Sequence, residues 1–175
     1  AAINLLQGKR IIVLAQTFAA LQRNIFAEIT ARLDEWKVEY HYNSTGMVIK
    51  IGKGICYVYS YENIEALRGL TEVSVCIADE IALAPNPDVL FAALSPVMRG
   101  KDIKPKMFAM TTPRGGSAWN ELFKNDKSWD IVTATTFDNT FLSKESIKNM
   151  EDSLSEDMKR QELYGDLLDM KVENA

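Results

Sequence analysis

The sequence predicts an α/β domain built around a mainly parallel β-sheet that is flanked by helices. Short apolar, β-favouring segments alternate with segments of helical periodicity, and two of the apolar segments stop abruptly in polar residues. Buried parallel strands have this character, and they present functional groups at their carboxyl ends. With 175 residues and 47% hydrophobic content, the chain is long enough to bury a sizeable core.

The first part of the chain is expected to supply a strand, a helix and an antiparallel meander. Residues 10–15 form the first apolar strand, and apolar residues at helical spacing predict an amphipathic helix over residues 17–36. Gly52-Lys53-Gly54 predicts a hairpin turn between two β-like segments. The three segments expected to form the meander, at the margin of the sheet, are residues 38–42, 47–51 and 55–59.

The second part of the chain continues the alternation and ends in helices. Residues 60–67 predict a short helix, and a longer one is expected from Asn86 to about Met98. The remaining strands are expected at residues 73–78, 106–110 and 129–135, and the remaining helices at residues 117–123 and twice after residue 143, with a break at 153–155. The simplest division is a core over residues 1–140 and a small helical lid over residues 141–175.

The strand at residues 73–78 leads directly into Asp79 and Glu80, two carboxylates that have different uses in nucleotide hydrolysis. Asp79, nearest the strand, is suited to hold Mg²⁺ directly or through water, and Glu80 to orient the attacking water and accept its proton. The structural alternative is that the pair simply ends a strand and caps the next helix. The pair alone does not decide between the two.

A second strand tip carries hydroxyl groups and a positive charge. Residues 106–110 lead into Thr111 and Thr112, whose hydroxyls would lie near a γ-phosphate if the two strands are neighbours. Pro113 and two glycines force a sharp exit from the strand, and Arg114 supplies a fixed positive charge. Such a tip can sense phosphate. The alternative is an ordinary strand-to-helix turn in which a threonine caps the helix.

Five segments in a fixed order along the chain carry a likeness to a known family. They are Arg68-Gly69-Leu70, Asp79-Glu80-Ile81-Ala82, Thr111-Thr112-Pro113-Arg114-Gly115, Asp138-Asn139-Thr140-Phe141-Leu142 and Arg160-Gln161-Glu162-Leu163-Tyr164-Gly165-Asp166. Together they cover nearly the whole chain. In this series the chain resembles the ATPase domain of the large terminase subunits of tailed bacteriophages.

The resemblance implies a P-loop NTPase fold of the RecA-like type with an additional-strand catalytic glutamate. It implies a motor that hydrolyses ATP with Mg²⁺ and translocates double-stranded DNA into procapsids. The partners it implies are the DNA, the portal protein of the procapsid, the small terminase subunit and further copies of the chain in a ring, with no membrane. Such a protein would work in the host cytoplasm, docked transiently on the portal.

The resemblance also implies roles for individual residues. The expected catalytic residues are Glu80 and Asp79, and Asp79 would hold Mg²⁺ through water. The residues expected to sense phosphate and couple hydrolysis to DNA movement are Thr111, Thr112 and Arg114. Candidate phosphate or DNA contacts are Arg68, Gln16 and Thr17. Thr17 has a structural alternative, which is to cap the helix behind it.

One feature of the family does not occur in the sequence. No Gly-x-x-x-x-Gly-Lys-[Ser/Thr] phosphate loop is present, and residues 1–6 look like the tail of the helix that would follow it. The strand carrying that loop would lie between the strands at 106–110 and 129–135. We therefore expect the chain to be a fragment that is inactive alone, with the family's nuclease domain beyond residue 175.

Charge, cysteine content and the length of apolar stretches give further information on the class of protein. The net charge of −4 does not indicate the basic surface of a dedicated nucleic-acid-binding domain. The two cysteines, Cys56 and Cys76, lie in apolar segments, so they are expected to be reduced core residues. No apolar stretch approaches the roughly twenty residues that cross a bilayer.

Two alternatives to a terminase remain open from the sequence. A helicase or other DNA-dependent ATPase lobe shares the acidic strand and a hydroxyl-rich tip, but the helical end with Arg160-Gln161-Glu162-Leu163 disfavours it. A non-catalytic scaffold or DNA-binding module derived from such an ATPase would explain why the phosphate loop does not occur.

Overall fold

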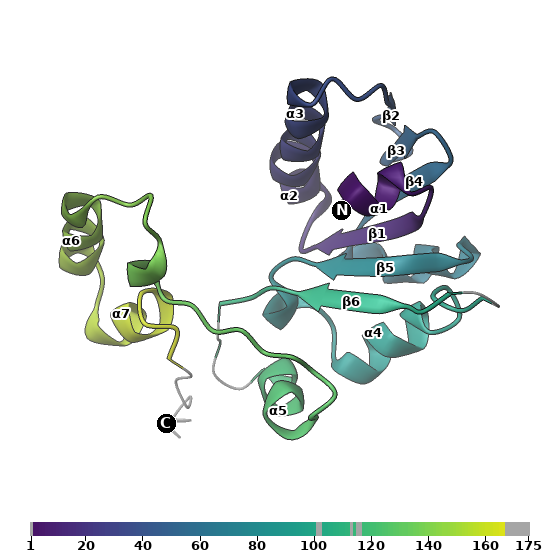
Figure 1. The fold of residues 1–175 in the computed structure, drawn as a ribbon. Helices are drawn as coiled ribbons and strands as arrows, with labels where there is room; N and C mark the ends of the chain where they lie inside the picture. Colours follow the sequence, from purple (N-terminus) through teal and green to yellow (C-terminus); the bar gives the residue numbers. More distant parts are fainter. Residues whose placement is uncertain (1, 101–102, 113, 115–116, 167–175) are drawn as a thin grey trace. The chain divides into compact units, whose positions relative to one another are not determined.

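A computed structural model describes residues 2–100, 103–112, 114 and 117–166 of the chain (Figure 1). The chain divides into two compact units, Ala1–Met110 and Thr111–Ala175. All described strands lie in the first unit, and the described part of the second unit contains helices and connecting segments. The division expected from the sequence, a core over residues 1–140 and a lid over residues 141–175, stays a prediction.

The first unit is built on a sheet of six strands in the order β2-β3-β4-β1-β5-β6. Strands β4, β1, β5 and β6 are parallel, whereas β2, β3 and β4 form an antiparallel meander at one margin. The strands are β1 Arg10–Ala15, β2 His41–Asn43, β3 Val48–Ile51, β4 Gly54–Ser60, β5 Val73–Ala78 and β6 Lys106–Ala109. The mainly parallel sheet, the meander and the hairpin turn between β3 and β4 are therefore confirmed.

The first helix of the first unit precedes β1 in sequence, and the other helices lie between strands. They are α1 Ala2–Leu6, α2 Phe18–Ala20, the π-helical η1 Leu21–Phe26, α3 Ala27–Glu35, the 3₁₀ segments η2 Tyr61–Gly69 and η3 Ile81–Leu83, and α4 Pro87–Leu94. The helix expected over residues 17–36 is present, but its middle is a π-helix. The helix α4 ends at Leu94 and not near Met98.

Strand β1 is the buried centre of the sheet. Its residues from Ile11 to Ala15 are at most 3% exposed, so both faces of the strand are covered. Side chains alternate between the two faces of a strand, so Ile11, Val13 and Ala15 share one face and Ile12 and Leu14 the other. The first of these faces belongs to a core cluster to which α1, η1, α3, β3 and β4 also contribute, through residues that include Leu5, Leu21, Leu33, Ile49 and Val58.

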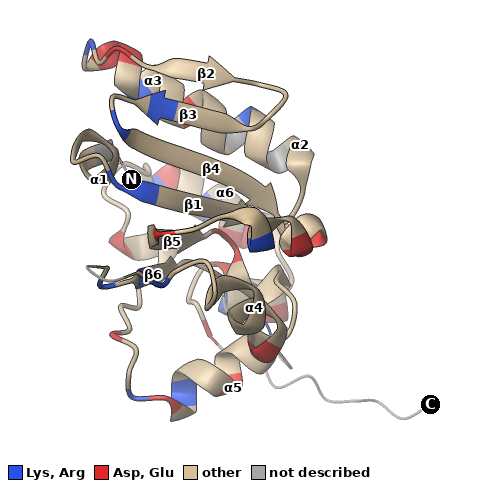
Figure 2. Ribbon diagram, turned by 90° about the vertical axis from the view of Figure 1, so that its right-hand side faces the viewer, with Lys and Arg blue, Asp and Glu red and all other residues tan. Residues whose placement is uncertain are grey.

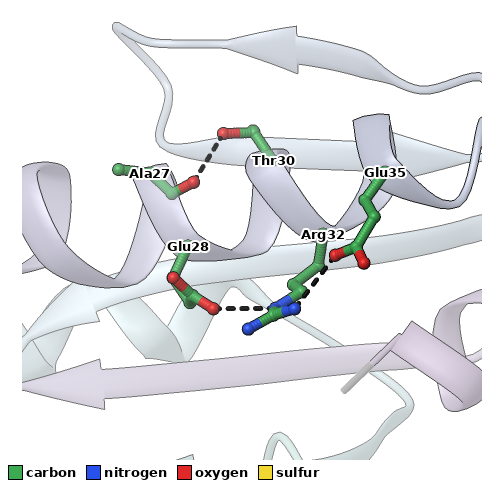
Figure 3. A network of polar contacts seen from close by, with 5 residues as sticks. All are labelled: Ala27, Glu28, Thr30, Arg32 and Glu35. Atoms are coloured by element: carbon green, nitrogen blue, oxygen red, sulfur yellow. Dashed lines mark hydrogen bonds and ion pairs between the residues drawn. The ribbon is translucent and has the colours of Figure 1, made fainter.

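Charged side chains keep to the outside of the first unit. Neither β4 nor β5 contains a Lys, Arg, Asp or Glu, and both strands are tan in Figure 2. On α3, Arg32 donates hydrogen bonds to Glu28 and Glu35, both at 2.9 Å (Figure 3). These two bonds raise the pKa of Arg32. Because all three side chains are more than half exposed, this network contributes little to stability.

The second unit contains short helices whose starts are set by capping. Its described helices are α5 Ala118–Asn125, the 3₁₀ turn η4 Thr136–Asp138, α6 Lys144–Ser153 and α7 Glu156–Glu162. Ser143 accepts a hydrogen bond from the Ser146 amide at 3.0 Å, and Ser155 accepts one from the Met158 amide at 3.4 Å. The second cap explains the break between α6 and α7, as the sequence predicted.

The prediction of a strand at residues 129–135 is wrong. The structure has no strand there, and the side chains of Ile131 and Val132 are 60% and 91% exposed. An apolar segment becomes a strand only when a neighbouring strand receives its hydrogen bonds. The neighbour assumed for this segment was a phosphate-loop strand, and β6 pairs with β5 alone within the described sheet.

Within the part of the chain that the structure describes, none of the helices has the length and apolar character that a membrane crossing requires.

The close approach of α1 to β4 predicts a destabilising substitution at Gly54. A Cβ atom there would overlap the backbone carbonyl of Leu5, which cannot rotate away as a side chain could. We expect Gly54→Ala to lower the free energy of unfolding by about 2–3 kcal/mol, measured by urea denaturation. Gly69→Ala is the matched control, because its Cβ would meet nothing within 4 Å. Equal stability of the two variants would contradict this packing.

The buried cysteines predict a pH dependence of reactivity and stability. Cys56 and Cys76 are free and buried, and burial raises the pKa of each thiol to about 12. The native thiols should not react with a disulfide reagent at pH 8 but should both react after unfolding in urea. Since an unfolded cysteine has a pKa of about 8.5, the stability conferred by these neutral thiols is complete below that pH and is lost as pH rises toward 12. Rapid reaction of the native protein would contradict the buried placement.

Candidate functional site

The acidic pair lies at the carboxyl end of β5 and is tied to the neighbouring strand. The backbone amide of Asp79 donates to the carbonyl of Leu14 in β1 at 2.8 Å. This bond continues the parallel ladder one residue beyond the end of β5. Asp79 and Glu80 are both partly exposed, whereas Ala78 before them and Ile81 after them are fully buried. The sheet thus holds two carboxylates at its surface between two buried anchors.

Glu80 has a left-handed backbone conformation, with φ 48° and ψ 55°. A residue with a Cβ atom pays a steric cost there, and such residues concentrate at functional sites. Its carbonyl accepts a hydrogen bond from the amide of Leu83 at 2.9 Å, which begins the 3₁₀ turn η3. The chain therefore turns sharply at Glu80 and does not continue along the strand.

The residue that follows β6, Met110, forms hydrogen bonds with the residues on either side of the acidic pair. The amide of Met110 donates to the carbonyl of Ala78 at 3.0 Å, and the carbonyl of Met110 accepts from the amide of Ile81, also at 3.0 Å. Met110 directly follows β6 and directly precedes Thr111. The two strand ends that the sequence indicated therefore lie side by side at one edge of the sheet.

Tyr61 also holds the acidic turn, and the sequence interpretation missed it. Its hydroxyl donates to the carbonyl of Asp79 at 2.8 Å, and the residue is only 5% exposed. Burial raises the pKa of this hydroxyl, and electrostatic interaction with Cys76, Asp79 and Glu80 raises it further. The only available signal was its position directly after the alternating strand β4.

The expected phosphate-sensing residues begin the second unit. The hydroxyl of Thr111 donates to the carbonyl of Thr112 at 3.0 Å. The carbonyl of Arg114 accepts a hydrogen bond from the side-chain amide of the buried Asn120, in the first turn of α5. These residues follow Met110 directly in the chain. Their role in sensing phosphate stays a prediction. Pro113 and the two glycines after Arg114 lie outside the described residues.

The candidate phosphate or DNA contacts have local structural explanations as well. Gln16 is exposed and Thr17 partly exposed, directly after β1 and so at the same edge of the sheet as the acidic pair. The carbonyl of Thr17 accepts the first helical hydrogen bond, from Leu21 at 3.1 Å, which is the position of a helix cap. Arg68 forms an ion pair with Glu65 at 2.6 Å on its own helix. A role for these residues in binding stays a prediction.

The donor groups fit a hydrated Mg²⁺ ion. Mg²⁺ prefers carboxylate oxygens and keeps several waters, so it needs only one or two protein ligands together with substrate phosphates. Asp79 offers such an oxygen at the open end of a parallel strand. Among the residues described, no group of three or more His, Cys, Asp or Glu side chains could hold a metal ion. A site completed by water and phosphate is therefore the kind that these side chains allow.

A protein-family comparison identifies the chain. The model of a family described as phage terminase large subunit matches residues 3–165, which is nearly the whole sequence. The chain belongs to the phage terminase large subunit family. The resemblance predicted from the five sequence segments is thus confirmed.

Solved structures confirm the fold of this terminase chain. The large terminase of a thermophilic bacteriophage matches with a TM-score of 0.75 and 16% identity, over 91% of this chain and 41% of that one. The same protein in complex with ATP-gamma-S gives 0.73 and 18%, over 91% and 40%. The ATPase domain of the Thermus phage P74-26 large terminase gives 0.69 and 16%, over 95% and 81%. The fold is therefore that of a terminase ATPase domain, of the RecA-like P-loop type.

The chain spans about 41% of the length of the first of these terminases, that of the thermophilic bacteriophage. A search of curated protein sequences finds no match.

The backbone of Glu80 predicts a difference between two substitutions that both remove its carboxylate. Glycine adopts a positive φ without steric cost and alanine does not. We expect Glu80→Gly to be more stable than Glu80→Ala by about 1 kcal/mol in urea unfolding. The usual order, in which alanine is the more stabilising residue, would show that the left-handed turn does not exist in solution.

Proposed function

We propose that this chain is the ATPase part of a viral DNA-packaging motor, in which ATP hydrolysis drives double-stranded DNA into procapsids. Membership of the terminase family supports the proposal, as does the ATP-gamma-S complex of the thermophilic bacteriophage terminase. The observation that carries it is the pair of hydrogen bonds by which Met110 contacts Ala78 and Ile81. Because of these bonds, the acidic pair and the exit from β6 meet at one edge of the sheet, where parallel α/β sheets bind ligands.

The two carboxylates would have separate roles in hydrolysis. Asp79, which continues the ladder of β5, would hold hydrated Mg²⁺, and a bound Mg²⁺ ion would neutralise charge on the terminal phosphates. Glu80, turned out of the strand by its left-handed backbone, would orient the attacking water and accept its proton at the carboxylate. The sequence contains no phosphate loop, so we propose that this chain alone does not turn over ATP.

The residues after Met110 would couple the nucleotide to DNA movement. Thr111 and Thr112 would respond to the γ-phosphate, and Arg114 would contribute positive charge near it. Arg68, Gln16 and Thr17 would serve as further contacts to phosphate or DNA.

The same proposal places the motor in an assembly. Its partners would be the portal protein, the small terminase subunit and further copies of the chain in a ring, in the host cytoplasm and transiently on the procapsid. The family match favours a terminase over a helicase lobe, since it extends to residue 165.

The role of Glu80 is tested in the full-length protein. We expect Glu80→Gln to lower the rate of ATP hydrolysis by about 10²–10⁴-fold, because glutamine cannot accept the proton from water. Binding of a fluorescent ATP analogue should stay within about twofold, since the change removes a charge but little volume. Glu39→Gln is the matched control, because Glu39 is an exposed glutamate after α3. Undiminished hydrolysis by Glu80→Gln would overturn the proposal.

A further inference from the structure

We propose that Tyr61 is a positioning residue of the hydrolytic site, because its hydroxyl fixes the turn that presents Asp79 and Glu80. This inference rests on the proposed function for the meaning of the turn. The hydrogen bond itself does not depend on that function.

The hydroxyl of Tyr61 acts on a peptide group that both carboxylate residues share. It donates to the carbonyl of Asp79 at 2.8 Å. That carbonyl and the amide of Glu80 belong to one planar peptide unit. A bond to its oxygen therefore restrains rotation on both sides of the plane, which means ψ of Asp79 and φ of Glu80.

The restraint matters because the conformation of Glu80 is unfavourable by itself. Its φ of 48° lies in the left-handed region that residues with a Cβ atom rarely adopt. Such a conformation persists only when the surrounding structure holds it. The amide of Asp79 is held by Leu14, its carbonyl by Tyr61 and the amide of Ile81 by Met110. Of these three bonds, that from Tyr61 is the one made by a side chain.

The ring of Tyr61 is itself fixed, so its hydroxyl is a rigid donor. Tyr61 is 5% exposed and opens η2, in which Ile64 and Leu67 are 7% and 0% exposed. The segment η2 is packed against α4, and it directly follows β4. The position of the acidic turn is therefore tied to the core through one aromatic side chain.

The chemistry of the hydroxyl suits a permanent donor. A phenolic hydroxyl has an ordinary pKa of about 10, so at neutral pH it carries the proton that it donates to the carbonyl of Asp79. The structure thus assigns Tyr61 to orientation of the acidic turn and not to proton transfer.

The test compares the variants Tyr61→Phe and Tyr59→Phe of the full-length protein. Tyr61→Phe deletes only the hydroxyl, and Tyr59 is a partly exposed tyrosine near the end of β4, the strand that Tyr61 directly follows. We expect Tyr61→Phe to lower kcat for ATP roughly tenfold with KM within about twofold. The reason is that a displaced turn weakens stabilisation of the transition state, whereas nucleotide binding does not depend on it. Tyr59→Phe should match the unmodified protein in both constants.

A second measurement separates positioning from general loss of stability. Amide hydrogen exchange is followed without nucleotide, at a temperature at which circular dichroism shows both variants folded. We expect Tyr61→Phe to speed exchange in the segment 79–83 at least about threefold, while β1 and β5 exchange as before. A merely structural role would raise exchange across the whole sheet.

Each outcome decides one of the two proposals. An unchanged kcat for Tyr61→Phe, or faster exchange spread equally over β1 and β5, would overturn the role of Tyr61. So would an equal effect of Tyr59→Phe. Full hydrolysis by the Glu80→Gln variant would overturn the proposed function, and the exchange measurement would still decide whether Tyr61 holds the turn.

Discussion

The parallel hydrogen bonding of β1, β5 and β6 is the constraint on which the candidate site depends. The ladder does not stop where the strands stop: Asp79 still donates to β1, and Met110 still donates to β5. Two chain segments that are distant in sequence are thereby brought to one edge with a fixed register. An antiparallel arrangement would place these two tips at opposite ends of the sheet, so the direction of pairing is what makes a shared site possible.

At Glu80 the steric preference of the backbone opposes the catalytic role that we propose for the side chain. The turn must leave the strand at once so that the carboxylate reaches solvent, and glycine would allow this turn at lower steric cost. Glutamate at this position costs stability, which the backbone bonds around it and the buried side chain of Ile81 offset. Strained residues that the surrounding structure supports concentrate at functional sites, which agrees with the catalytic role that we propose for Glu80.

Local pattern predicted much of the fold, and non-local contacts set the limit. The strands β1 and β5 and the acidic pair were predictable, because a buried parallel strand shows as a continuous apolar segment that ends in polar residues. The segment 129–135 looks similar but is not a strand, since strand formation depends on a partner that local pattern cannot supply. The bond from Tyr61 to Asp79 was equally out of reach, because it joins the end of β4 to the end of β5, two strands separated by β1.

The central place of β1 also has a consequence for how the chain acquires its structure. Both partners of this strand, β4 at Gly54–Ser60 and β5 at Val73–Ala78, come after it in the sequence. On the ribosome, this apolar segment after Arg10 emerges before either of these two partner strands. The chain loses the entropy of loop closure before the contacts between these distant strands can stabilise it. We therefore expect folding to be slow for a domain of this size. The nascent chain would thus need shielding from aggregation until β5 has been synthesised.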